Sequence, residues 1–224
     1  MAGIEALKAA SSTIEAAFNQ SKQCILFYSG GKDSAAVLNL LEKTYSKNDI
    51  HLVFMPYVDG LAETELVIDM AKKHGHSGVH LYQHWGYFKD KANGAYCIKQ
   101  GKPKKLDDIY REVRHDLGLL PVFTGAKRSD GMWRRFNIMN TGKGKNYTGI
   151  YMPIYAWSKY DVLLYLRKNN LEYLKQEGER ISGVDLSHHY ILWAKENQPQ
   201  SYEAIKREFP FIDAVFIRQE LKNG

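Results

Sequence analysis

The chain has 224 residues, of which 44% are hydrophobic and 25% are charged, so it can bury a core without disulfides or metal ions. Its two cysteines, Cys24 and Cys97, provide neither a disulfide framework nor a Cys-x-x-Cys pair for zinc. There is no apolar run long enough to cross a bilayer and no N-terminal signal pattern, so the sequence predicts a cytoplasmic protein without a membrane partner.

Positive charge is concentrated in the middle of the chain. The formal net charge is +6, yet residues 86–145 alone contain 14 lysines and arginines against 6 acids. Such a segment favours an anionic partner, for example phosphates, a nucleic acid or a sulfated nucleotide. The alternative is a solvated lysine-rich loop, which we favour for residues 99–105.

Hydrophobic periodicity predicts helices alternating with strands. In chain order these are a helix at 4–18, a strand at 24–29, a helix at 32–45, a strand at 51–59, a helix at 62–75, a strand at 78–83, an irregular basic stretch, a helix at 105–118, strands at 121–125 and 149–155, and a helix at 158–170 that Ser158 caps. The tail from 188 to 221 is predicted to be helical, with breaks at Pro199 and Pro210.

This alternation predicts an α/β fold: a Rossmann-like, doubly wound parallel sheet with helices on both faces and a helical C-terminal extension. We assign residues 1–187 to a nucleotide-binding domain and residues 188–224 to the extension. Ligands of such sheets bind at the carboxyl ends of the strands, so the residues that follow each strand are the candidates for a site.

The turn after the first predicted strand has the features of an anion site. Adjacent glycines allow unusual backbone angles and let a ligand approach the main chain, and the following helix directs its N–H groups and dipole at the turn. Lysine and serine side chains add a full charge and hydroxyl donors. The predicted phosphate-binding residues are Ser29, Gly30, Gly31, Lys32, Asp33 and Ser34.

This turn does not fit the G-x-x-x-x-G-K-[ST] loop, because Asp33 follows Lys32. It matches S-G-G-x-D-S and so resembles the PP-loop superfamily, whose members typically split ATP between its α and β phosphates. After the second strand, "VDGLAETE" resembles the V-D-T-G-x-x-x-x-E-T stretch of the phosphoadenosine phosphosulfate (PAPS) reductase-like family. The resemblance implies that Asp59 lies near a ribose or a metal-bound phosphate, with an ordinary loop carboxylate as the alternative. We interpret Glu63 as a first-turn helix residue.

A third match follows the predicted strand at 121–125. The sequence "GAKRSDGMWRR" resembles the family pattern G-x-R-x-x-[DE]-S-x-x-R, with Lys127 in place of the usual arginine and Gly131 in place of the serine. The resemblance implies that Gly125 contacts the nucleotide and that cations here clamp the phosphates or a second substrate; a surface basic turn is the alternative. The predicted catalytic cations are Lys32, Lys127, Arg128 and Arg134. The stretch 152–173 resembles a scaffold helix of the family.

The departures from the family concern thiols. No cysteine follows Cys97, so the C-terminal nucleophile of PAPS reductases is missing. Val184 and Ser187 stand where some relatives have cysteines, which predicts no iron–sulfur cluster at that place. Cys97 is a reactive thiol if Lys99 lowers its pKa, but we favour an inert, partly buried residue. We interpret the histidines of residues 74–84 as surface or packing residues.

Three functions remain open from the sequence. The first is an enzyme that cleaves ATP, with Mg²⁺ as the expected cofactor, to adenylylate an acceptor of unassigned chemistry. The second is a protein that binds PAPS or a related sulfonucleotide, with any thiol supplied from elsewhere. The third is a tRNA or DNA modification enzyme or binder that uses the basic middle segment.

Overall fold

The computed structural model describes residues 4–118, 120–131, 149–174 and 184–223. The chain divides into two compact units. The first comprises Met1–Phe54, Val67–His80 and Leu117–Lys175, and the second comprises Met55–Leu66, Leu81–Asp116 and Gln176–Gly224. Residues 188–224 thus form one unit with two earlier segments, and the predicted domain boundary after residue 187 stays a prediction.

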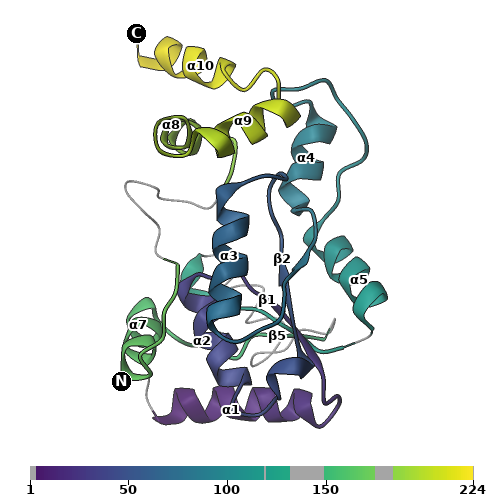
Figure 1. Cartoon of the computed structure of the whole chain (residues 1–224), viewed down its shortest axis with the longest axis vertical. Helices are drawn as coiled ribbons and strands as arrows, with labels where there is room; N and C mark the ends of the chain where they lie inside the picture. The colour runs from purple at the N-terminus through teal and green to yellow at the C-terminus, as the bar shows by residue number, and fades with distance from the viewer. Residues whose placement is uncertain (1–3, 119, 132–148, 175–183, 224) are drawn as a thin grey trace. The chain divides into compact units, whose positions relative to one another are not determined.

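A five-stranded sheet carries the candidate site (Figure 1). Its strands are β1 (Cys24–Phe27), β2 (Ile50–Phe54), β3 (His80–Leu81), β4 (Val122–Phe123) and β5 (Ile150–Tyr151), in the order β3-β2-β1-β4-β5. Strand β1 pairs in parallel with β2 and with β4, and β4 pairs in parallel with β5. The predicted α/β class with a parallel sheet is confirmed, although the strands are shorter than predicted. Because the strand order reverses between β1 and β4, the loops after these two strands lie at a switch point, where ligands bind in such sheets.

Helices α1 (Ile4–Phe18), α2 (Lys32–Leu41) and α7 (Lys159–Lys168) belong to the first unit, and α3 (Ala62–Lys73) continues into it from the second. Helix α2 packs on α7, and α1 packs on α2 and β5. The predicted cap of α7 is confirmed, since the Ser158 hydroxyl accepts a hydrogen bond from the Asp161 N–H at 3.1 Å. Buried residues of α1, α2, the strands and α7 form one apolar core, which includes Ala10, Ile14, Leu26, Leu38, Phe123, Trp157 and Leu166.

The described helices of the second unit are α4 (Trp85–Asn93), α5 (Leu106–Leu117, of which all but Leu117 lie here), α8 (His188–Asn197), α9 (Pro199–Glu208) and α10 (Ala214–Asn223). The predicted breaks at Pro199 and Pro210 are confirmed, because α9 begins at Pro199 and α10 begins after Pro210. The prediction of an irregular segment at 85–93 was wrong. There the His84 imidazole caps α4 by accepting the Gly86 N–H at 3.1 Å, and Gly94 ends the helix at a φ of 70°.

Tyrosine–carboxylate hydrogen bonds recur in the second unit. The phenols are buried or partly buried, so each needs a polar partner, and ionised carboxylates are strong acceptors. The pairs are Tyr57–Asp90, Tyr82–Asp116, Tyr87–Glu208, Tyr190–Glu63 and Tyr202–Asp213. Because three of these five pairs join α8 or α9 to other segments, the C-terminal helices are fixed to the rest of their unit by polar as well as apolar contacts.

Helix α9 also caps the first turn of α3. The Ser201 hydroxyl, which is fully buried, accepts a hydrogen bond from the Ala62 N–H at 3.0 Å. We expect Ser201→Ala to lower the free energy of unfolding by about 1 kcal/mol, because it leaves one helix N–H without its acceptor. Thermal unfolding followed by circular dichroism measures this change. Ser12→Ala, on the exposed face of α1, is the control, and an equal effect of the two substitutions would contradict the capping role.

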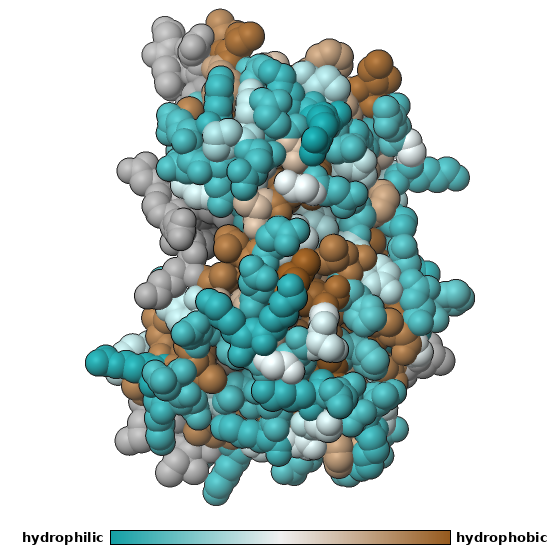
Figure 2. Space-filling view, viewed as in Figure 1, coloured by the Kyte–Doolittle hydropathy of each residue, from teal (hydrophilic) through white to brown (hydrophobic). Residues whose placement is uncertain are grey.

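Several large apolar side chains reach the surface, among them Ile98, Phe211, Ile217 and Leu221. Figure 2 shows apolar residues scattered among hydrophilic ones on the face that it draws. Among the described helices, none is both long enough and apolar enough to cross a membrane.

Candidate functional site

The glycine turn lies between β1 and α2, as predicted. Gly30 has a φ of 68°, which an L side chain rarely adopts, and a Cβ added there would lie 2.6 Å from the Leu174 side chain. The Gly30 carbonyl accepts the Leu174 N–H at 2.8 Å. Gly31 is the extended N-cap residue of α2. The turn therefore requires glycine at position 30 for its backbone conformation and for the close approach of Leu174.

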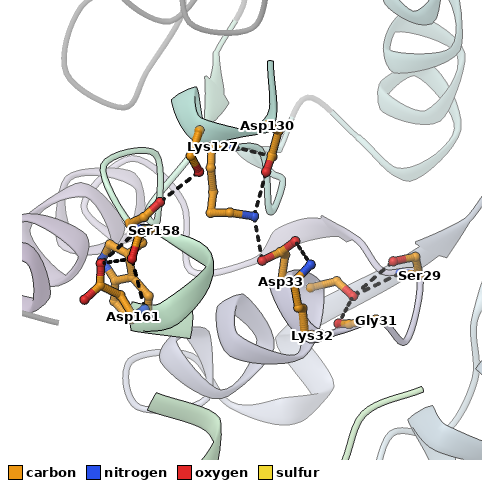
Figure 3. Close-up of polar contacts among 11 residues, drawn as sticks. Ser29, Gly31, Lys32, Asp33, Lys127, Asp130, Ser158 and Asp161 are labelled. Carbon is orange, nitrogen blue, oxygen red and sulfur yellow. Dashed lines mark hydrogen bonds and ion pairs between the residues drawn. The ribbon is translucent and has the colours of Figure 1, made fainter. Parts of the chain in front are cut away.

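The two serines of the turn have different environments. The Ser34 hydroxyl donates to the Gly31 carbonyl at 2.9 Å, accepts from the Ser29 N–H at 3.3 Å, and is buried. The Ser29 hydroxyl lies 3.3 Å from that of Ser34, but Ser29 is exposed. Ser34 thus closes the turn, whereas Ser29 is open to a ligand (Figure 3).

Charged side chains form a chain of ion pairs beside the turn (Figure 3). Asp33 lies between two lysines: its Oδ2 accepts from Lys32 Nζ at 2.9 Å, and its Oδ1 lies 2.7 Å from Lys127 Nζ. Lys127 Nζ also lies 3.0 Å from Asp130 Oδ1. Lys32 keeps 31% of its side chain exposed, while Lys127 keeps 1%. Of these two lysines, only Lys32 is therefore accessible to a ligand in this conformation.

The turn after β4 packs directly on the glycine turn. A Cβ added to Gly125 would lie 3.0 Å from the backbone carbon of Asp33, so a side chain there would separate the two turns. The N–H of Arg128 donates to the Tyr155 carbonyl at 3.0 Å, and the Ser129 hydroxyl donates to the Trp157 carbonyl at 3.2 Å. These contacts place the exposed Arg128 at the same switch point as Lys32. Arg134 lies outside the described residues.

Asp59 and Glu63 belong to the second unit. Asp59 is exposed, and the prediction that it binds a nucleotide stays a prediction. Glu63 is 8% exposed, lies in the first turn of α3 as predicted, and accepts a hydrogen bond from the Tyr190 phenol at 3.0 Å. Its carboxylate thus joins α3 to α8.

Cys97 and His84 lie in environments that favour their uncharged forms. Burial raises the pKa of the Cys97 thiol, and the charge of Lys91 opposes this effect. Burial also lowers the pKa of His84, the cap of α4. Across the described ranges, no group of three or more His, Cys, Asp or Glu side chains is arranged to hold a metal ion.

Two residues of the site were missing from the predicted set. Asp130 matches the family pattern three positions after Lys127, so its spacing was a usable signal. Leu174 packs against Gly30 from a segment far along the chain, and nothing in the sequence indicates that contact.

Comparison with known proteins identifies the family and a similar fold. Residues 23–178 match the family model of the phosphoadenosine phosphosulfate reductase domain, whereas no curated protein matches the chain. NH3-dependent NAD synthetase from Campylobacter jejuni subsp. jejuni NCTC 11168 has a similar fold, with a TM-score of 0.50 and 14% identity over 98% of this chain and 95% of that chain.

Two further solved structures are similar at lower TM-scores. Phosphoadenylyl-sulfate (PAPS) reductase from Candida auris has a TM-score of 0.48 and 18% identity over 78% of this chain and 90% of that chain. The U34-tRNA thiolase NcsA from Methanococcus maripaludis has a TM-score of 0.48 and 14% identity over 93% of this chain and 79% of that chain.

Proposed function

The chain belongs to the phosphoadenosine phosphosulfate reductase domain family of the PP-loop superfamily, and from this premise we propose that residues 29–34 hold the phosphates of an adenine nucleotide. The observation that carries the proposal is the turn itself: paired glycines lie between β1 and α2 at the switch point of the sheet, with the partly exposed side chain of Lys32 beside them. A helix N-terminus, the exposed Ser29 hydroxyl and one accessible cation are elements of a phosphate site.

The reaction that we assign to this site is adenylyl transfer from ATP. An acceptor oxygen attacks the α-phosphorus, a new P–O bond forms, and the bond from the α-phosphorus to the bridging oxygen breaks. Pyrophosphate leaves with that electron pair, and the acceptor loses its proton to solvent. Lys32 and the N–H groups at the start of α2 would stabilise the charge that develops on pyrophosphate. Arg128 is the exposed cation that we assign to the acceptor or the phosphates. We do not assign Lys127 a direct phosphate contact, because its ammonium already contacts two carboxylates.

Substitution of Lys32 tests this function. We expect Lys32→Ala to weaken ATP binding by roughly tenfold to a hundredfold, the worth of one charge-assisted hydrogen bond. Isothermal calorimetry with ATP measures the affinity, and pyrophosphate release reports the reaction. Lys168→Ala, which removes one exposed positive charge at the end of α7, is the matched control. Equal affinities for ATP in the two variants would rule out the proposed role of the turn.

Binding of a sulfonucleotide is the second candidate, and the description of the matching family favours it. Reduction of such a ligand would require a thiol from another molecule, because the chain has no cysteine after Cys97. The same calorimeter distinguishes the two ligands: a clear preference for PAPS over ATP would replace adenylyl transfer with this function while keeping the turn as the phosphate site.

Nucleic-acid modification is the third candidate. It is supported by exposed lysines of the basic segment that have no ion pair among the described residues, namely Lys89, Lys99, Lys102 and Lys105. Binding of mixed nucleic acid that weakens steeply with salt would support this candidate, and a flat response would remove it.

A further inference from the structure

We infer that Lys127 is a built-in counter-ion of the phosphate-binding turn: its ammonium takes the place of a divalent cation between Asp33 and Asp130, so these carboxylates do not ligate Mg²⁺. The inference deepens the proposed function, since it concerns the metal requirement of the same site. It also revises the expected role of Lys127, from a ligand of the substrate to a residue that positions Asp33.

The geometry is that of a cation held by two carboxylates, one from the first turn of α2 and one from the turn after β4 (Figure 3). Lys127 Nζ lies 2.7 Å from Asp33 Oδ1 and 3.0 Å from Asp130 Oδ1. These contacts are close ion pairs and not aligned hydrogen bonds, so the attraction rests on charge more than on direction. An ammonium with 1% of its side chain exposed requires such counter-charges, because a buried unpaired charge is strongly unfavourable.

The turn that carries Lys127 is fixed in this position. Asp130 Oδ2 accepts the backbone N–H of Lys127 at 3.0 Å, which closes the turn on itself. Gly125 allows the turn to lie against the backbone of Asp33 and Ser34. The lysine therefore reaches Asp33 from a preformed turn, and its ammonium joins the loop after β4 to the first turn of α2.

This cluster places two ammonium groups against two carboxylates. In the part of the chain that the structure describes, the carboxylates of Asp33 and Asp130 face the ammonium groups of Lys32 and Lys127. Mg²⁺ binds oxygen ligands at about 2.0–2.1 Å, and an ion at that distance from both carboxylates would stand against the Lys127 ammonium, a repulsive neighbour. The residues beside the turn thus do not fit a metal site. A Mg²⁺ ion that enters with ATP would be held by phosphate oxygens and water.

Removal of the ammonium tests the inference without any nucleotide. In Lys127→Ala the two carboxylates lose the cation that they share and gain space, so we expect this variant to bind about one Mn²⁺ per chain that the wild type does not bind, and to be stabilised by it. Equilibrium dialysis with Mn²⁺ and a thermal unfolding series with and without Mn²⁺ measure the two effects. The double variant Lys127→Ala/Asp130→Asn should lose the added ion. A folded Lys127→Ala that binds no more Mn²⁺ than the wild type would overturn the inference.

A second comparison applies even if Lys127→Ala does not fold. If the Lys127 ammonium takes the place of a metal ion between the two carboxylates, Asp130→Asn in the otherwise wild-type chain leaves Mn²⁺ binding unchanged. The reason is that the Asp130 carboxylate then holds no metal. Loss of a bound Mn²⁺ in Asp130→Asn would show that the carboxylates ligate a metal despite Lys127, and would overturn the inference. Mn²⁺ binding and thermal stability are both measured without ATP. A failure of this inference can therefore be distinguished from a failure of the proposed function.

Discussion

We expect Trp157→Ala to lower the free energy of unfolding of the first unit by about 4 kcal/mol, within the range for truncation of a large buried aromatic residue. The Trp157 side chain is 1% exposed and packs edge-to-face on Tyr165, with ring centroids 5.2 Å apart. Its indole N–H donates to the Ala6 carbonyl at 3.4 Å. The substitution removes apolar contact area and this hydrogen bond together, and urea unfolding followed by circular dichroism measures the loss.

The same substitution reaches the candidate site through the backbone. The Trp157 carbonyl accepts the Ser129 hydroxyl, and the Tyr155 carbonyl accepts the Arg128 N–H. A cavity under this segment removes the support on which the turn of Lys127 and Arg128 rests. Trp157→Phe, which refills part of the cavity, is the control and should cost roughly half as much. Equal losses for the alanine and phenylalanine variants would contradict a packing role for the indole.

The parts of this site that the sequence predicts are those encoded locally. The glycine turn, the start of α2 and the cap at Ser158 each depend on residues within one short segment, and the structure has all three. Lys127 is different, because its partner Asp33 lies in the first turn of α2, 94 positions earlier. The family pattern indicated a cation at position 127, but only the tertiary contact shows that this cation faces carboxylates.

Helix α4 shows that local sequence also fails to predict some elements of the fold. Its sequence, WGYFKDKAN, has Ala92 as its one aliphatic residue, and its buried residues are Gly86 and Lys91. A buried lysine gives no hydrophobic signal, so periodicity cannot identify the inner face of this helix. The face is set by Glu208, at the end of α9, and by the adjacent Phe209, both more than a hundred positions later and both in contact with the Lys91 ammonium.

Loss of the Lys91 ammonium is the second substitution for which we expect a large loss of stability. We expect Lys91→Met to lower the free energy of unfolding of the second unit by about 3 kcal/mol, the lower end of the cost of breaking a buried ion pair, because Glu208 keeps 41% of its side chain exposed. Lys91 Nζ lies 2.9 Å from Glu208 Oε2 and also donates to the Glu208 carbonyl. It lies 4.9 Å from the ring centroid of Phe209 and 5.4 Å from that of Tyr87, so aromatic faces add to its stabilisation.

The pH dependence of this effect has a defined sign. Hydrogen bonds from Lys91 and Tyr87 hold the pKa of Glu208 below its ordinary value of 4.5. A lowered pKa in the folded state contributes stability above the ordinary value, and that contribution is lost as the pH falls through the lowered one. The difference between wild type and Lys91→Met should therefore be full at pH 7 and shrink as the pH falls below 4.5.

Hydrogen exchange of the α4 and α9 amides measures this loss in the second unit alone, since exchange reports local opening. Lys89→Met is the matched control: it removes a positive charge from the same helix, but Lys89 is exposed and lies 6.0 Å from the Trp85 ring centroid. Surface substitutions of this kind change stability by about 0.5 kcal/mol or less. If the α4 and α9 amides exchange no faster in Lys91→Met than in Lys89→Met, the Lys91 ammonium does not hold the two helices together. The apolar contacts of Phe209 would then have to account for their packing.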